Sequence, residues 1–306
     1  MPQKISVVIP NFNGANLLSK NLPQVLKNCP GCQIIVVDDA STDNSVSILK
    51  EKFKNIKLLI NPENLGFSGA VNRGIKNSSG DLVLLLNSDV SPRIGFLKPT
   101  LDRFKDKKVF AVALNDCSHE GGKIIERGKG GANYKKGFLN HFAARIGEGE
   151  TLWVSGGSGL FVREILNRLG GFDPIYSPFY WEDIDLSFRA RQNGYICIFE
   201  PASKVDHYHE EGAIKKTRKP FEIKTISYRN QFIFIWKNFS DPIFLVQHLL
   251  WFPYHLLKAI MSKDFAFFLG FTKALAKIPQ IVQNPQYRVS PKAVSDRDVI
   301  KKFEKP

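Results

Sequence analysis

Short apolar segments alternate with longer amphipathic segments along the first third of the chain. The apolar segments are rich in Val, Ile and Leu, and they span residues 5–9, 33–37, 56–60, 81–86 and 109–114. Such runs are typical of strands buried on both faces of a parallel sheet. The segments between them have the length and pattern of helices, at residues 15–28, 42–54, 67–77 and 93–105. This alternation predicts an α/β fold with a mostly parallel sheet, flanking helices and right-handed crossovers.

Polar residues follow the predicted strands at their carboxyl ends, where sheets of this kind collect ligands. The first strand leads into Pro10-Asn11-Phe12, the second ends in Asp38-Asp39, and the fourth ends in Asn87-Ser88-Asp89. Ordinary turn chemistry explains one such loop. Its repetition at successive strand ends indicates a binding site at that edge of the sheet.

The segment "YWEDIDLSFRARQNGY", residues 180–195, places three carboxylates at the start of a predicted helix. Acidic residues are common there because the helix dipole and the free N–H groups favour negative charge. Asp185 also precedes Arg189 by four residues, a spacing that suits an ion pair, so we expect a structural role for it. The local pattern leaves open whether Glu182 and Asp183 are helix-start charges or catalytic groups.

Two regions depart from the α/β pattern. Residues 115–150 are rich in Gly and Lys and are predicted to form a surface excursion or flexible loop. Residues 213–306 hold 17 Lys and Arg but only 6 Asp and Glu, so they carry most of the net charge of +14. We therefore predict an α/β domain over residues 1–212 and a basic, aromatic-rich helical extension over residues 213–306.

The predicted extension allows two interpretations. Its longest stretch without a charge, residues 242–257, is shorter than the roughly 20 apolar residues of a membrane-spanning helix. Basic residues beside amphipathic, aromatic segments favour helices that lie on an anionic membrane surface. The alternative is that these helices pack on the α/β domain or in a dimer. Nucleic-acid binding would rest on charge alone, and we do not expect it.

A cytosolic location is expected from the first residues and from the cysteines. The chain enters a strand pattern without a signal segment, and four cysteines do not make a disulfide framework in a chain of this size. Cys29 and Cys32 form a C-x-x-C, but it lies in a Pro-Gly turn without a second cysteine pair. We do not expect a redox or zinc site there.

A set of motifs occurs in order over residues 5–210. The motifs are "SVVIPNFNG", "VVDDASTDNS", "NLGFSGAVNRGI", "LLLNSDV", "GGSGLFVRE", "GGFD", "YWEDIDLSFRARQNGY" and "PASKVDH". Together they resemble the family 2 inverting glycosyltransferases of the GT-A fold, in their rhamnosyltransferase-like branch. No single motif decides the matter, but the ordered set is specific.

The resemblance implies an enzyme that moves a sugar from a nucleoside diphosphate to a hydroxyl of a glycan or lipid-linked acceptor. Transfer would proceed with inversion and with Mg²⁺ or Mn²⁺ as the divalent cation. The branch suggests dTDP-rhamnose or a UDP-sugar as the donor. Together with the basic extension, it suggests a cytoplasmic enzyme, peripheral on the inner face of the cell membrane, that serves polysaccharide biosynthesis at the cell envelope.

The resemblance also assigns the acidic helix start. Asp183 becomes the general base and Glu182 its support, because the acceptor hydroxyl must lose its proton as it attacks the anomeric carbon. Tyr180 and Trp181 become candidates for stacking on the acceptor sugar.

Metal and donor binding are assigned by the same resemblance. The metal ligands would be Asp89 and His207, with His209 as a weaker substitute. Asn87 leaves one carboxylate where other branches have two, so free metal should bind poorly. The implied donor-binding residues are Pro10, Phe12, Asp38, Asp39, Asn72, Ser88 and Gly157.

Two other classes of protein compete with the transferase interpretation. A dinucleotide-dependent oxidoreductase would need G-x-G-x-x-G after the first strand, whereas "NFNGAN" has one glycine. A non-catalytic nucleotide- or phosphate-binding module, or a receiver-like signalling module, could use the acidic strand ends. The receiver-like arrangement would want its acidic pair on the first strand, and it leaves residues 150–210 unexplained.

Overall fold

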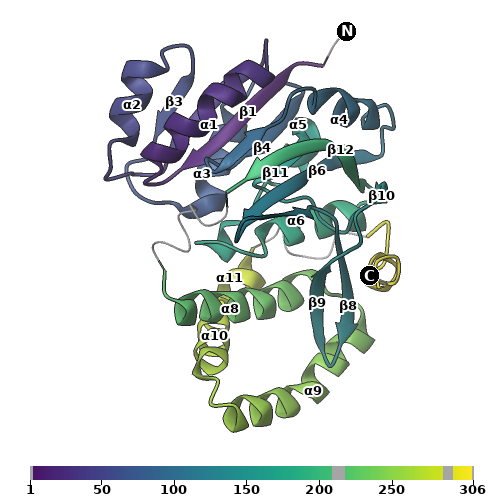
Figure 1. Ribbon diagram of the computed structural model, residues 1–306. Coiled ribbons are helices and arrows are strands. Elements are labelled where there is room, and N and C mark those ends of the chain that lie inside the picture. The colour runs from purple at the N-terminus through teal and green to yellow at the C-terminus, as the bar shows by residue number, and fades with distance from the viewer. Residues whose placement is uncertain (1–2, 209–217, 285–291, 305–306) are drawn as a thin grey trace.

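The computed structural model describes residues 3–208, 218–284 and 292–304. Figure 1 shows a central sheet with helices against it, and a second group of helices, α8 to α10, below the sheet. The two parts are in contact through an apolar core that includes side chains of α6 and α8.

The central sheet is mixed. Its strand order is β10-β12-β6-β11-β4-β1-β2-β3, with β5 paired to β12 and β7 paired to β6. β1 runs parallel to β2 and β4, β2 runs parallel to β3, and β11 is antiparallel to both of its neighbours, β4 and β6. The strands are β1 (Ile5–Asn11), β2 (Gln33–Asp38), β3 (Lys57–Ile60), β4 (Leu82–Leu86), β5 (Val90–Pro92), β6 (Val109–Glu120), β7 (Lys123–Arg127), β10 (Gly149–Glu150), β11 (Ser158–Val162) and β12 (Ile196–His207).

Helices cover both faces of the sheet and bury its side chains in two apolar cores. One core joins β1 and β4 to α1, α2 and α4, and the other joins the opposite face to α3, α5 and α6. The predicted strands and helices of the first third are confirmed, although α2 and α4 are shorter than expected. These helices are α1 (Ala15–Asn28), α2 (Ser45–Lys52), α3 (Gly66–Lys76), α4 (Leu97–Arg103), α5 (Arg163–Arg168) and α6 (Glu182–Gln192).

The prediction of a flexible loop over residues 115–150 is wrong. β6 continues to Glu120 and pairs with β7, and β8 (Gly130–Lys135) forms a separate hairpin with β9 (Phe138–Ala143). The glycines that suggested a loop lie at the turns, where Gly121, Gly122 and Gly137 have left-handed backbone angles. The strands between these turns include buried Phe138 and Leu139, so the segment is ordered by its apolar positions.

The helices that follow residue 217 share a third apolar core with α6 and the β8–β9 hairpin. The predicted boundary between residues 212 and 213 lies outside the described residues, and α8 beyond it buries Phe232, Ile233, Phe234 and Ile235 almost completely. The helices of this part are α8 (Pro220–Asn238), α9 (Pro242–Met261), α10 (Phe265–Leu275), α11 (Ile278–Gln283) and α12 (Asp296–Lys301). The 3-10 turn η1 (Pro174–Tyr176) precedes α6 and also contributes side chains to the third core.

A buried ionic network fixes α8 against α6. Lys237 Nζ lies 2.6 Å from Asp173 Oδ2 and 2.7 Å from Asp185 Oδ1. Asp185 Oδ2 also pairs with Arg189 at 2.7 Å, which confirms the predicted four-residue ion pair, and the Asn238 amide donates to Asp185 Oδ1. A buried carboxylate needs such partners because desolvation penalises an unpaired charge heavily.

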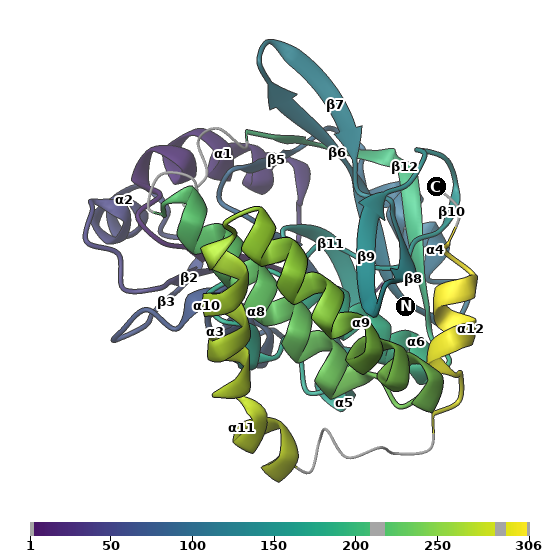
Figure 2. The same ribbon diagram turned by 90° about the horizontal axis from the view of Figure 1, so that it is seen from below.

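α9, α10 and α11 expose much of their apolar surface. Figure 2 shows α9 and α10 side by side across α8, on the side away from the sheet. Within the described residues, Pro242–Met261 and Phe265–Gln283 are long and apolar enough to cross a membrane, which is weak evidence by itself. We define the α9–α11 surface by its most exposed apolar side chains: Ile243, Val246, Leu249, Leu250, Leu257, Ile260, Met261, Phe265 and Val282.

The ionic network predicts a difference between two lysines of α8. Lys237→Ala leaves Asp173 and Asp185 buried with less compensation, and we expect a loss of about 3–5 kcal/mol in the free energy of unfolding. Lys224 pairs with Asp264 but its side chain is 53% exposed, so Lys224→Ala should cost less than about 1 kcal/mol. Urea unfolding of both variants measures this, and equal losses would contradict the account.

Candidate active site

A cleft of about 420 Å³ lies at the carboxyl ends of β1 and β4. It is completed by the start of α3, the loop after residue 154 and the start of α6. Ten of the residues implied by the family resemblance line it: Pro10, Phe12, Asp39, Ser88, Asp89, Gly157, Tyr180, Glu182, Asp183 and His207. The cleft therefore brings together residues from six separate parts of the sequence.

Glu182 and Asp183 enter the cleft from the first turn of α6. The two residues before them, Tyr180 and Trp181, both have left-handed backbone angles, φ 70° and φ 76°, which are uncommon for residues with a Cβ. This turn exposes Tyr180 to the cleft and sends Trp181 into the third core. It also starts α6 at Glu182, so the helix begins at the cleft wall.

The two adjacent carboxyl groups differ in their protonation. Burial, and then the neighbouring Asp183 carboxylate, raise the pKa of Glu182 well above its ordinary value. Burial raises the pKa of Asp183 to about 6, against the opposing effect of hydrogen bonds from the backbone of Ile184 and Gly156. The Ile184 N–H donates to Asp183 Oδ1 at 2.8 Å. Burial thus favours the neutral form of Glu182, whereas Asp183, with a pKa of about 6, is mainly an ionised carboxylate of raised basicity at neutral pH.

A second polar group lies where β4 and β12 end. His207 Nε2 lies 3.3 Å from Asp89 Oδ1, and His207 Nδ1 donates to Asp116 Oδ2 at 2.5 Å. Burial lowers the pKa of His207, but the Asp116 and Asp89 carboxylates more than offset this and raise it to about 9. Asp116 thus orients the ring so that Nε2 faces Asp89, as carboxylates commonly do behind a metal-binding histidine.

The Asp89–His207 pair fits a divalent cation that arrives with further ligands. Asp89 Oδ1 is buried and, among the described residues, makes no hydrogen bond; its contact with His207 at 3.3 Å is an ion pair without hydrogen-bond geometry. One carboxylate oxygen and, once a bound cation has displaced its Nε2 proton, one imidazole nitrogen are suitable ligands for Mn²⁺ or Mg²⁺. The described part of the chain holds no cluster of three or more such groups, so diphosphate oxygens or water would have to complete the shell.

Three predicted residues lie outside the lining of the cleft. Asp38 is fully buried and accepts hydrogen bonds from Asn11 Nδ2 at 2.9 Å and from the Ser41 N–H at 3.0 Å. Asn72 is bonded to both main-chain groups of Phe172. Trp181 is 4% exposed and packs in the third core. These three side chains support the walls of the cleft, and His209 lies outside the described residues.

Other residues of the site were not predicted. Asp116 was missed because the strand was expected to end at residue 114, whereas β6 continues past it. The bonds of the predicted residue Asp39 were not predicted either: its carboxylate accepts the N–H groups of Leu65 and Gly66 at the start of α3. The remaining unpredicted lining residues are neighbours of predicted ones or new loop contacts: Asn11, Asn64, Gly66, Phe67, Ala70, Asn87, Ser155, Gly156, Pro178, Phe179 and Arg218.

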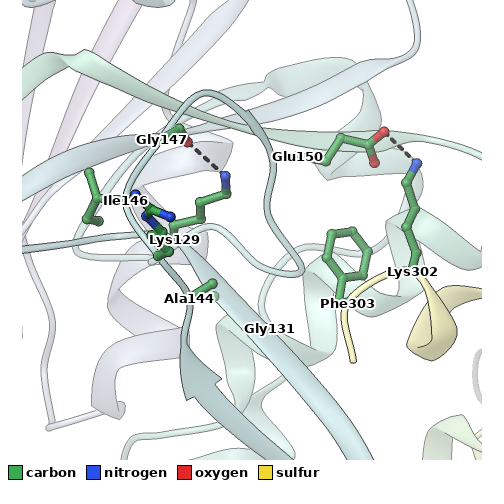
Figure 3. A pocket seen from close by; sticks show the side chains of 10 residues that line it. Lys129, Gly131, Ala144, Ile146, Gly147, Glu150, Lys302 and Phe303 are labelled. Atoms are coloured by element: carbon green, nitrogen blue, oxygen red, sulfur yellow. Dashed lines mark hydrogen bonds and ion pairs between the residues drawn. The ribbon is translucent and has the colours of Figure 1, made fainter. Parts of the chain in front are cut away.

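A larger cavity, of about 680 Å³, lies away from this cleft, between the base of the β8–β9 hairpin and the C-terminal residues. Figure 3 shows its two polar contacts, Lys129 to the Gly147 carbonyl and Lys302 to Glu150. Lys302 and Glu150 form an ion pair, Lys129 is held by main-chain carbonyl groups, and the residues that line this cavity include one carboxylate and neither His nor Cys. The smaller cleft is therefore the candidate active site.

Comparison with known proteins identifies the family. Residues 6–170, more than half of the chain, match the family described as "Glycosyl transferase family 2". The chain belongs to glycosyl transferase family 2. The family 2 resemblance inferred from the motifs is confirmed.

Two relatives from Mycobacterium tuberculosis are similar to this family 2 member over part of its length. The chain is 28% identical over 217 residues to a pre-mycofactocin glycosyltransferase, across 67% of this chain but only 43% of that protein. It is 26% identical over 238 residues to an N-acetylglucosaminyl-diphospho-decaprenol L-rhamnosyltransferase, across 66% of this chain and 74% of that protein.

Solved structures identify the fold of this glycosyltransferase as GT-A. GalNAc-T7 with UDP, GalNAc and Mn²⁺ is similar with a TM-score of 0.63 at 17% identity, over 93% of this chain and 58% of that one. A mannosyltransferase from Pyrobaculum calidifontis with GDP-Man and Mn²⁺ has a TM-score of 0.56 at 17% identity, over 99% and 85% of the two chains.

The environment of Asp183 predicts how stability depends on pH. Its pKa is raised from 3.8 to about 6 on folding, so ionisation opposes the folded state progressively as the pH rises through this interval and fully above it. We expect Asp183→Asn to stabilise the protein at pH 7.5 by on the order of 1–3 kcal/mol, but not at pH 4. Urea unfolding at both pH values measures this, with exposed Glu164→Gln as the control; equal effects of Asp183→Asn at the two pH values would contradict it.

Proposed function

We propose that this family 2 glycosyltransferase transfers a hexosyl or deoxyhexosyl group with inversion, from a nucleoside-diphosphate sugar to a hydroxyl of a glycan or lipid-linked acceptor. Asp183 is the general base in this proposal. The observation that carries it is one cleft with a carboxylate of pKa about 6 in its wall and the Asp89–His207 pair at the strand ends.

In the reaction, the acceptor hydroxyl oxygen forms a bond to the anomeric carbon while the bond from that carbon to the diphosphate oxygen breaks. Asp183 takes the hydroxyl proton, and the nucleoside diphosphate leaves with the bonding electrons. Attack opposite the leaving group inverts the anomeric configuration, through a transition state with oxocarbenium character. The raised pKa of the neighbouring Glu182 favours its neutral form, so the negative charge of the pair falls preferentially on Asp183.

The donor side of the cleft holds the leaving group. A divalent cation held by Asp89 and His207 would supply positive charge to the departing diphosphate, and Arg218 in the lining adds another. Pro10, Phe12 and Asp39 lie where the nucleobase and ribose would bind. The rhamnosyltransferase relative favours dTDP-rhamnose, whereas the UDP-bound structural neighbour favours a UDP-sugar, and a panel of donors distinguishes them.

The acceptor side is formed by Tyr180, which lines the cleft and is 42% exposed. The α9–α11 surface, with basic Lys258, Lys263 and Lys273 exposed beside it, supports a peripheral position on an anionic, cytoplasmic membrane face. A lipid-linked acceptor is consistent with that position. The alternative is a non-catalytic nucleotide-binding role. Turnover of a nucleotide sugar in the measurement below would exclude this alternative, and the absence of turnover would favour it.

The first prediction concerns the base. Asp183→Asn keeps the size of the side chain but cannot accept the proton, so turnover should fall by about 10²–10⁴-fold while the dissociation constant of the nucleotide changes little. Diphosphate release from a panel of nucleotide sugars measures turnover. If Asp183 only starts the helix, Asn is a good replacement and turnover stays normal, which would overturn the assignment.

The second prediction concerns the metal. Asp89→Ala should nearly abolish turnover, and excess EDTA should do the same to the unmodified enzyme, because the protein alone offers two ligands. His207→Ala should have a smaller effect. Asp102→Ala, which removes an exposed carboxylate on α4, serves as the control. Full turnover in excess EDTA would contradict the proposed metal role.

The third prediction concerns the membrane. The full chain should sediment with vesicles that contain anionic lipid and be released by salt. Leu250→Asp together with Leu257→Asp, on the α9–α11 surface, should abolish this, whereas Ile94→Asp, 82% exposed elsewhere, should not. Binding that is equal for neutral and anionic vesicles, or absent for both, would contradict the proposal.

A further inference from the structure

The turn that presents Asp183 has an unusual backbone. Tyr180 and Trp181 both occupy the left-handed region, with φ 70° and 76°, where the Cβ of an L-residue crowds the following carbonyl oxygen. Neither is a glycine, so the local sequence does not favour this conformation. Such a turn persists only where surrounding contacts determine it.

The contacts come from two neighbouring side chains of α8, Asn230 and Arg229. Asn230 is fully buried, and the two N–H groups of its Nδ2 are shared among three carbonyl oxygens, those of Tyr176 at 2.9 Å, Phe179 at 2.9 Å and Tyr180 at 2.8 Å. Its Oδ1 accepts from Arg229 Nε at 2.8 Å. The amide therefore gathers three carbonyl groups of the segment that runs directly into the left-handed turn.

The neighbouring Arg229 acts on the same segment. Its Nη2 donates to the carbonyl oxygens of Tyr176 at 3.0 Å and Ser177 at 2.5 Å. Because Arg229 also bonds to Asn230 Oδ1, it fixes which end of the Asn230 amide faces the carbonyl groups. The two residues together leave the segment little freedom to rotate.

The helix that carries Asn230 is itself held firmly. Lys237 ties it to Asp173 and Asp185. On its other side Gly270 of α10 packs so closely that an added Cβ would lie 2.7 Å from Tyr228 Cβ and 2.9 Å from the Thr225 carbonyl oxygen. α8 is thus a fixed support between α6 and α10 (Figure 1).

We propose that Asn230 is a positioning residue: its side-chain amide holds the Tyr180–Trp181 turn and thereby aims Asp183 into the cleft. Asn230 is absent from the described lining of the cleft, so it acts through the turn and not on the substrate. This inference rests on the proposed role of Asp183 as the base.

The test is a comparison of substitutions at residue 230. Asn230→Ala removes all three donated bonds, and we expect kcat to fall at least about tenfold, because a misplacement of about 1 Å can cost up to 10²-fold. The KM for the donor should change less than about threefold. Asn230→Ser, which keeps one donor, should have an intermediate kcat, and it gives the measurement if the alanine variant does not fold. Gln231→Ala, whose lost bond goes to Leu139 of β9, is the matched control and should keep a normal kcat.

A double variant separates this inference from the assignment of the base. If Asn230 acts through Asp183, then Asn230→Ala combined with Asp183→Asn should be no slower than Asp183→Asn alone. A slow Asp183→Asn with a normal kcat for Asn230→Ala, or with fully additive losses, would overturn the positioning role. A normal kcat for Asp183→Asn would instead overturn the proposed base.

Discussion

The candidate active site depends on the ion pairs of the buried Asp185 carboxylate. This carboxylate has no solvent exposure, yet it is ionised, because Arg189, Lys237 and Asn238 hold its pKa well below the usual range despite the opposing effect of burial. Tyr176 donates a further hydrogen bond at 2.8 Å. These partners come from α6, α8 and the 3-10 turn η1, so the charge can be buried only when all three elements are assembled.

This constraint explains why three carboxylates in four positions behave differently. Asp185 lies on the inner face of α6 and pairs with Arg189 and Lys237, Glu182 is buried and its pKa is raised well above the ordinary value, and Asp183 is partly exposed in the cleft. Their spacing along one helix gives each carboxyl group a different environment. Only Asp183 combines access to a ligand with a pKa near neutrality. α8 is thus part of the structure that supports the candidate active site, since it supplies the charge that Asp185 requires.

Much of the fold follows from the sequence because burial on both faces of a sheet leaves a clear apolar pattern. The edge of the sheet that carries the candidate site could also be predicted, since polar residues recur at successive strand ends. The β8–β9 hairpin could not be predicted, because glycines and lysines dominate the local composition although positions such as Phe138 and Leu139 are buried.

Single residues were harder to place because side-chain direction depends on backbone angles. Asp38 and Asp39 are adjacent, but side chains of an extended chain alternate between faces, so Asp39 reaches the cleft and Asp38 points inward. Tyr180 and Trp181 diverge because of a left-handed turn that their sequence does not signal. Asn230 could not be found from the sequence, because its role depends on a helix packing against a loop 50 residues earlier.

The central claim is that the surroundings of α6 keep Asp183 available as a base near neutral pH. The most direct measurement is the kcat/KM for the donor of the unmodified enzyme from pH 5 to pH 8, with the fold verified at each pH, because kcat/KM reports the pKa of the enzyme without bound donor. The account predicts a kcat/KM that is half-maximal at about pH 6 and falls about tenfold for each pH unit below that point. A kcat/KM that stays constant between pH 5 and pH 7 would contradict it.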